Sequence, residues 1–291
     1  MSEIKTIAVF GGTGLLGRPV VRELLAGGYG VRCLVRDAQR AADLAAAGAS
    51  LVVGDLRKAA DIDRTLEGCQ GVYLNLSVPY EARRTDWQAE DHGLAAVLAA
   101  AHAAGIQHVV YLASIIRHHA GSRDWWVFQL KNRAVAQVQG CGLPWTVFEP
   151  SAFMENFTEG RQIRNGRITV IGQARHKLHY IAGSDYGQTV AAAFRTPSAR
   201  NRLYTVQGPE ALFPLEAART FAAHYAAKPL KVGTAPLGLF NLLGTFVRPL
   251  NFLAHLMTAL NEHPEPFASQ PTWDELHRPT VKLADYARSA G

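Results

Sequence analysis

A glycine-rich loop between a short apolar run and a helical pattern constrains this chain more than any other feature. The run covers residues 5–10, and GGTGLLG (11–17) follows it directly, with glycines at G-x-x-G-x-x-G spacing. A helical pattern over 18–26 begins at once. Glycines permit the tight turn and a close approach of phosphate to the backbone, while the helix N-terminus offers N–H donors to an anion. This context favours a dinucleotide-binding loop over an empty structural turn.

The first half of the chain alternates between short apolar runs and Ala/Leu-rich helical patterns. Strands are predicted over residues 5–10, 31–35, 50–53, 71–76, 109–112 and 145–148, and helices over 18–26, 38–47, 59–66, 87–104 and 128–139. Fully apolar strands that alternate with helices are typical of a parallel sheet covered on both faces. The sequence therefore predicts an α/β fold with a doubly wound parallel sheet, the Rossmann arrangement.

The residue after the second strand indicates which dinucleotide is bound. Arg36 follows that strand, 19 residues beyond Gly17, and Arg40 lies one helical turn further on. At this place an acidic residue bonds the ribose hydroxyls of NAD, whereas arginine accepts the extra phosphate of NADP. Arg36 and Arg40 therefore favour NADP(H). Asp37 is the competing candidate for ribose binding. If the strand ran one residue longer, Asp37 would bond the ribose hydroxyls, and Arg36 would stack on the adenine or be solvated.

The alternation loosens after about residue 150, which predicts a second, smaller part of the molecule. We expect residues 1–155 to form a Rossmann NADP(H)-binding domain that recaptures about 177–207, and residues 156–176 and 208–291 to form a small, mainly helical C-terminal cap or substrate domain. Within the recaptured segment the sequence predicts strands over 177–181 and 203–206 and a helix over 184–194.

Residues 235–260 are the most apolar part of the chain, and Arg248-Pro249 divides them in two. Each half is shorter than the roughly 20 residues that a membrane span requires. Two interpretations stay open: a pair of cap helices over a pocket or core, or attachment to a membrane surface. For Trp125 and Trp126 two interpretations also stay open: they line an apolar pocket, or they pack the domain.

Composition excludes several other classes of protein. The 291 residues are 48% hydrophobic and 19% charged, which is typical of a soluble globular protein rather than a disordered chain. Cys33, Cys69 and Cys141 are scattered singly, so a disulfide framework is not expected. The N-terminus lacks a signal-peptide pattern, and we expect a cytoplasmic protein. The net charge of +6 is not accompanied by a nucleic-acid-binding motif, so a nucleic-acid partner is not expected.

Several sequence blocks, in this order, resemble the NmrA-like family of atypical short-chain dehydrogenase/reductases. The blocks are GGTGLLG (11–17), VRDAQR (35–40), GDL (54–56), HVVYLAS (108–114), GLPWTV (142–147), EPSAFMEN (149–156), SDYG (184–187) and YTVQGPE (204–210). The glycine loop is shared by the whole superfamily, whereas the EPSAFMEN, SDYG and QGPE blocks are more specific. The resemblance implies NADP(H) across the carboxyl ends of the strands, with a small C-terminal domain closing the cleft.

The resemblance also implies positions for the cofactor. The loop would border the pyrophosphate, Arg36 and Arg40 the ribose phosphate, Asp55 and Leu56 the adenine, and the remaining residues the nicotinamide side. The predicted cofactor-binding residues are Gly11, Thr13, Gly14, Leu15, Leu16, Gly17, Arg36, Arg40, Asp55, Leu56, Leu76, Ser77, Lys131, Pro150 and Phe153.

The usual proton donor of the superfamily is absent from this sequence. Ordinary members use a Tyr-x-x-x-Lys pair on one helix, in which the tyrosine relays a proton. Here Val127 occupies the tyrosine position, while Lys131 is retained and is the predicted catalytic residue; its alternative is a solvated helix lysine. Ser114 corresponds to a structural serine, and we assign it no chemistry. Glu149 departs from the arginine often found at this position in the family, so the family's cleft electrostatics do not carry over to this chain.

The histidines are weaker candidates for a proton donor or a metal ligand. His118 and His119 follow the fifth strand, so they either face the cleft as proton donors or lie in an exposed loop. His176 and His179 have no third ligand at a suitable spacing, and a metal site is not expected. A G-x-S-x-G elbow does not occur in the sequence, which argues against a hydrolase.

Two functional hypotheses follow from the sequence. The first is an NADPH-dependent oxidoreductase that reduces a small, apolar, conjugated or quinone-like substrate without the Tyr-x-x-x-Lys pair. The second is a non-catalytic NADP(H) redox sensor that acts through a protein partner. We expect a monomer or a homodimer in either case.

Overall fold

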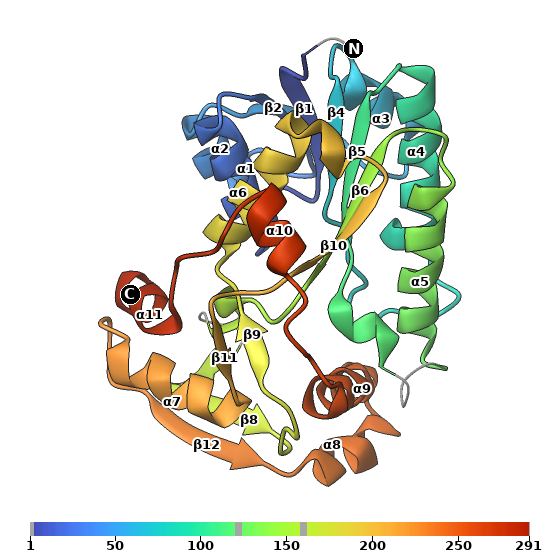
Figure 1. The fold of residues 1–291 in the computed structure, drawn as a ribbon. Helices are drawn as coiled ribbons and strands as arrows, with labels where there is room; N and C mark the ends of the chain where they lie inside the picture. The colour runs from blue at the N-terminus through green and yellow to red at the C-terminus, as the bar shows by residue number, and fades with distance from the viewer. Residues whose placement is uncertain (1–2, 120–123, 158–161, 291) are drawn as a thin grey trace.

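The computed structural model describes residues 3–119, 124–157 and 162–290. Within these ranges a seven-stranded sheet has the order β10-β6-β5-β4-β1-β2-β3, and every neighbouring pair is parallel (Figure 1). Its strands are β1 (Thr6–Phe10), β2 (Gly30–Val35), β3 (Ser50–Val53), β4 (Gly71–Leu74), β5 (His108–Leu112), β6 (Trp145–Pro150) and β10 (Arg202–Val206). The predicted parallel sheet is therefore confirmed.

Helices cover both faces of this sheet. They are α1 (Gly17–Ala26), α2 (Ala42–Ala46), α3 (Ala59–Leu66), α4 (Leu94–Ala103), α5 (Trp126–Gln139) and α6 (Gly183–Arg195). Successive side chains of a strand point to opposite faces. On β1, Ile7 and Val9 join a buried cluster with α1 and α6, while Ala8 and Phe10 join a second cluster with α3, α4 and α5. Burial on both faces explains why the strands are apolar throughout, and it confirms the doubly wound arrangement.

Two predicted helices differ from the observed elements at their N-terminal ends. The pattern over 38–47 begins with a 3₁₀ turn, Gln39–Ala41, before α2. The pattern over 87–104 begins with a π turn, Ala89–Gly93, before α4. A π turn carries an extra residue within the helix and is frequent at functional sites. This turn buries Glu90 completely.

The C-terminal part combines helices with two small sheets, β12-β8-β7 and β11-β9. Its elements are β7 (Ile163–Arg164), β8 (Arg167–Ile171), β9 (Leu178–Tyr180), β11 (Glu210–Leu212), α7 (Pro214–His224), β12 (Lys231–Ala235), α8 (Leu237–Gly244), α9 (Arg248–Glu262), α10 (Gln270–Glu275) and α11 (Leu283–Ser289). The strand predicted over 177–181 does not join the main sheet: β9 pairs with β11, because β10 occupies the place beside β6. The domain boundaries stay a prediction.

The SDYG and QGPE blocks attach the C-terminal segment to the rest of the molecule. Asp185, buried at the start of α6, accepts hydrogen bonds from His277 Nε2 (3.0 Å) and from the Val281 N–H (2.9 Å). The Gln207 side chain accepts from the Ala268 N–H (2.7 Å). A buried carboxylate with such donors is costly to replace, because its partners would be left unpaired. These blocks therefore hold the segment against the main domain.

The apolar segment 235–260 forms two helices. α8 ends at Gly244, and α9 begins at Arg248 with Pro249 in its first turn, as the Arg248-Pro249 pair predicts. No helix within the described ranges is long and apolar enough to cross a membrane.

A buried carboxyl at the junction of the two parts makes stability depend on pH. Glu155 accepts a hydrogen bond from the Gly183 N–H at the start of α6 (2.7 Å), and burial raises its pKa from 4.5 to about 7. Between these values the folded protein binds a proton that the unfolded chain does not. The stabilising contribution is therefore fully present below about pH 4.5 and is lost as the pH rises through about 7.

We predict that Glu155 lowers the free energy of unfolding by about 2 to 3 kcal/mol between pH 5 and pH 8, whereas His108, whose pKa burial lowers to about 3, acts in the opposite direction over this range. Glu155→Gln keeps the acceptor for Gly183 but cannot ionise, so its unfolding free energy should lack the decrease that Glu155 causes. Urea denaturation at both pH values measures the difference. Equal pH dependence of the two proteins would contradict the prediction.

Candidate cofactor site and active site

The glycine loop is packed so closely that two of its positions exclude any side chain. A Cβ atom at Gly11, where φ is +90°, would lie 2.0 Å from the carbonyl oxygen of Asn75, just after β4. A Cβ atom at Gly17 would lie 2.1 Å from the carbonyl oxygen of Gly11. Both separations are far below van der Waals contact. Glycine at these two positions therefore allows the loop to pack against β4 and α1 to begin beside it.

The loop leaves the N-terminus of α1 available for an anion. Thr13 and Gly14 are exposed. Leu16 occupies the N-cap position, and its apolar side chain cannot accept a hydrogen bond from the first turn of the helix. The first turn then contains Arg18 and no acidic residue. The Arg18 N–H is bonded to the Gly14 carbonyl and Pro19 has no N–H, so what the helix offers a pyrophosphate is chiefly the positive end of its dipole. The arrangement fits the predicted dinucleotide-binding role.

A first cavity of about 380 Å³ extends from the loop toward the end of β2. Seven of the predicted cofactor residues line it: Gly11, Thr13, Arg36, Asp55, Leu56, Leu76 and Ser77. Asp37 has another role, because its Oδ1 accepts a hydrogen bond from the Gln39 N–H (2.8 Å) in the turn that follows. This turn favours Arg36 over Asp37 as the residue that meets the ribose.

Other predicted residues lie away from this cavity. Arg40 is exposed, and its carbonyl oxygen accepts a hydrogen bond from Arg18 Nη2 (2.6 Å). Within the described part of the chain, Gly14, Leu15, Gly17 and Arg40 line neither this cavity nor the second one described below. Gly17 acts through packing instead.

Two of the first-cavity residues that sequence reasoning missed, Arg57 and Trp87, contact each other. The Arg57 guanidinium lies 5.0 Å from the centroid of the Trp87 ring, within cation–π range, and both residues line the cavity. Arg57 adjoins the predicted pair Asp55 and Leu56, so its place beside them was a usable signal. Trp87 begins the helix predicted over 87–104 but lies just before the π turn, and no local pattern marks it as a cavity residue.

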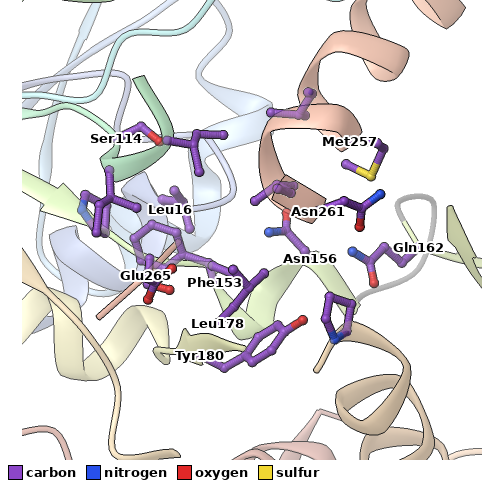
Figure 2. A pocket seen from close by; sticks show the side chains of 18 of the residues that line it. Leu16, Ser114, Phe153, Asn156, Gln162, Leu178, Tyr180, Met257, Asn261 and Glu265 are labelled. Carbon is purple, nitrogen blue, oxygen red and sulfur yellow. The ribbon is translucent and has the colours of Figure 1, made fainter. Parts of the chain in front are cut away.

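A second cavity of about 310 Å³ continues from the first, since Asn75, Leu76 and Ser77 line both. Leu16, Lys131, Pro150 and Phe153, all predicted, border it from the main domain. β9 and α9 close the opposite side with mostly apolar residues, including Leu178, Met257 and Leu260 (Figure 2). The cap helix interpretation of the apolar segment is thus supported for α9.

Lys131 is held at the second cavity by a buried carboxylate. Lys131 Nζ lies 2.7 Å from Glu90 Oε1, and the Tyr111 hydroxyl donates to the same oxygen at 2.7 Å. Glu90 is fully buried in the π turn, and burial, together with the Glu90 carboxylate, raises the pKa of Tyr111 well above 10.0. Tyr111 therefore stays protonated and donates. The solvated-lysine alternative does not hold, because Lys131 is paired and mostly buried.

The positions that carry hydroxyl groups in the superfamily are occupied here by Val127 and Ser114, and neither is assigned a catalytic role. Val127 is buried within the cluster that joins α5 to α9. Ser114 borders the second cavity without an assigned role. Trp125 packs at 4.9 Å from the Phe252 ring, so it belongs to the same cluster, and neither tryptophan lines the joined cavities.

The negative charge of Glu149 is balanced by neighbouring side chains. Its Oε1 accepts from Arg117 Nε (2.5 Å) and lies 2.9 Å from His118 Nε2. His118 and His119 are absent from the described lining of both cavities. His119 is buried and lies 3.8 Å from Glu262. Neither histidine is therefore placed as a proton donor to the cavity.

His179 belongs to another buried cluster, in which its Nδ1 lies 3.1 Å from Glu265 Oε1. His176 is not part of this contact. Among the described residues no group of three or more His, Cys, Asp or Glu side chains is arranged to hold a metal ion.

Together, the fold and the joined cavities define a Rossmann protein with a dinucleotide cleft and an apolar chamber beside it. A family model described as the NmrA-like family matches residues 3–270. The chain therefore belongs to the NmrA-like family, as its sequence blocks indicate.

Curated relatives include proteins of two kinds. An NAD(P)H azoreductase from Xenophilus azovorans is 30% identical over 227 residues, which cover 77% of this chain and 75% of the relative. Photosystem II assembly factor Ycf39 from Trieres chinensis is 28% identical over 245 residues, covering 82% of this chain and 74% of the relative.

Solved structures show the same fold. Triphenylmethane reductase from Citrobacter, complexed with NADP(H), superposes with a TM-score of 0.73 at 18% identity and covers 98% of this chain and 99% of the other. An NADPH-dependent quinone oxidoreductase from Escherichia coli, complexed with NADPH, gives 0.72 at 19% identity, with 97% and 98% covered.

Proposed function

We propose that this protein is an NADPH-dependent reductase of a small, apolar, conjugated or quinone-like substrate. The observation that carries the proposal is the joined pair of cavities at the carboxyl edge of the main sheet. One cavity is bordered by the glycine loop and Arg36, and the other is mostly apolar and closed by α9. The relatives add support, since the azoreductase is named for NAD(P)H and the two structural neighbours hold NADP(H) or NADPH.

The residues of each cavity have distinct tasks in this proposal. Arg36 would bind the ribose phosphate, and the first turn of α1 would bind the pyrophosphate. Leu76, Pro150 and Phe153 would flank the nicotinamide. NADPH, when bound, supplies a hydride to the substrate, and a proton from the surroundings completes the two-electron reduction. The apolar walls exclude water from this reaction.

Lys131 is the residue of this chain best placed to assist the chemistry. Glu90 fixes the direction of its ammonium group at the edge of the second cavity. From there the ammonium can bind the nicotinamide ribose or stabilise negative charge on the substrate. A conjugated acceptor becomes a stabilised anion on reduction and needs little from a strong acid, which is consistent with Val127 in the tyrosine position.

We predict that NADPH binds more tightly than NADH and that Arg36→Ala reduces this preference by about 10- to 100-fold, the effect expected for one lost charged hydrogen bond. Titration calorimetry with both cofactors measures it. Arg40→Ala is the matched control, because Arg40 lies outside both cavities, and it should change the preference much less. Equal affinities in the unmutated protein would show that the NADP(H) assignment is wrong.

We predict that Lys131→Met lowers the rate of NADPH oxidation with a quinone panel by about 10²-fold or more. Because this change leaves Glu90 without its cation, Lys131→Met/Glu90→Gln should recover stability without recovering the rate. Arg133→Met, an exposed position on the same helix, is the control. A Lys131→Met enzyme as fast as the unmutated protein would rule out this role.

A second candidate is the NADP(H) redox sensor that acts through a protein partner. Val127 in place of the usual proton donor favours it, as do the relatives named as photosystem II assembly factors. Tight binding that distinguishes NADPH from NADP⁺, without turnover on any member of the quinone panel, would support the sensor. Steady NADPH oxidation that depends on Lys131 would support the enzyme.

A further inference from the structure

The second cavity holds one ionisable acid whose charge no lysine or arginine pairs with. Of the ionisable side chains that line it, Lys131 is already paired with Glu90. Tyr180 is the second, and burial raises its pKa, so it stays neutral; the third is Glu265, a buried residue in the segment after α9. Within the described ranges Glu265 makes its one ion-pair contact with His179.

The surroundings of Glu265 keep it ionised. Burial by itself would raise its pKa, but hydrogen bonds from His179, Ser151 and Gln207 outweigh burial, and the net effect is a pKa below 4.5. Gln207 Nε2 lies 3.1 Å from Oε1, and the His179 N–H lies 3.0 Å from the same oxygen. The second oxygen, Oε2, is buried, and no described residue other than Ser151 is placed to donate to it.

An ionised carboxylate at the wall of a mostly apolar cavity, with no described lysine or arginine paired with it, favours a ligand that supplies a positive charge or a donor. A buried charge is costly, and a cation or an N–H group that fills the cavity would relieve that cost. A neutral apolar ligand of the same shape would leave the negative charge unbalanced, and an anionic ligand would be repelled.

We propose that Glu265 is a substrate-binding residue that selects, among small conjugated acceptors, those that carry a cationic or hydrogen-bond-donating group away from the reduced centre. This inference rests on the proposed function. We assign the residue to the substrate because Glu265 and its partner His179 come from the C-terminal part of the chain, and Glu265 lines the second cavity but not the first.

The test uses three benzoquinones of similar size, carrying a trimethylammoniomethyl, a neopentyl or a sulfonatomethyl group. Their affinities are measured by titration calorimetry as the hydroquinones in the presence of NADP⁺, and KM values are measured wherever there is turnover. We expect the cationic probe to bind at least tenfold more tightly than the neutral one. Glu265→Gln should abolish that ratio while changing the affinity for the neutral probe by less than threefold.

Three outcomes would overturn the inference: no preference for the cationic probe in the unmutated protein, an unchanged preference in Glu265→Gln, or NADPH binding weakened tenfold by the same substitution. The last would assign the carboxylate to the cofactor. Because glutamine keeps an acceptor for His179, folding is expected to survive, and a melting temperature checks it; Ser151→Ala is a second variant that should weaken the preference. Absence of turnover with all three probes would count against the proposed reductase, while the calorimetric ratio still decides the role of Glu265.

A second, independent observation concerns the outer face of α8. Phe246 is 85% exposed and Leu242 63% exposed, and three further apolar residues are also exposed on this helix or in the turn after it: Leu239, Leu243 and Val247. Clustered exposed side chains of this size mark an interaction surface. We refer to these five residues as the α8 patch.

Charge indicates what covers the α8 patch. Residues 237–261, which comprise α8 and all but the last residue of α9, contain Arg248 and no Asp or Glu. Arg248 begins α9 at one end of the helix pair, and Arg175, whose N–H donates to the Asn261 carbonyl (2.7 Å), lies at the other end. Glu262, just beyond this stretch, is near His119. A second copy would bring like charges together, whereas an anionic lipid surface complements both the leucines and the arginines.

We infer that the α8 patch docks on an anionic membrane surface. The next helix, α9, forms part of the wall of the second cavity. Docking of α8 would therefore place that wall near the membrane, which is a source of apolar compounds. The docking is peripheral, because α8 is far too short to span a bilayer.

Sedimentation with vesicles tests this inference. We expect binding to 3:1 phosphatidylcholine:phosphatidylglycerol vesicles and at least tenfold weaker binding to phosphatidylcholine alone. Leu242→Ser/Phe246→Ser should reduce binding to the anionic vesicles at least tenfold, whereas Leu203→Ser, an exposed leucine on β10, should not. Failure to bind anionic vesicles, or a dimer in light scattering that the double substitution dissociates, would overturn the inference.

Discussion

The close backbone contact between the glycine loop and the end of β4 is the constraint on which the functional part of the molecule depends. Gly11 approaches the Asn75 carbonyl, and Gly17 approaches Gly11, at separations that no side chain tolerates. This contact sets where α1 begins and where the sheet edge opens. Asn75 also lies where the two cavities meet, so one packing arrangement fixes the glycine loop and the passage between the cavities.

The main sheet and the glycine loop could be predicted from the sequence because both depend on local patterns. Apolar strands such as 71–76 and 109–112 alternate with helices, and the glycine spacing follows directly from steric need. Arg36 could also be placed, since it immediately follows β2. The strand over 177–181 was predicted, but its pairing with β11 was not, because a three-residue strand carries no information about its partner.

The residues that complete the site could not be predicted, because they depend on contacts far apart in the chain. Glu90 reaches Lys131 across 41 positions, and a π turn, which leaves no clear sequence signal, buries it there. Glu265 reaches His179 across 86 positions. The sequence blocks that identify the family are informative in a different way, because Asp185 and Gln207 act by holding the C-terminal segment rather than by touching the cavities.

The division of the cleft between distant parts of the chain has an evolutionary consequence. The first cavity is lined entirely by residues before position 90, while the second takes much of its wall from residues after 150. Substitutions in β9 or α9 can therefore reshape the chamber beside the cofactor site while leaving the lining of that site intact. A lineage built on this plan can exchange one acceptor for another, or lose turnover altogether, without having to reinvent dinucleotide recognition.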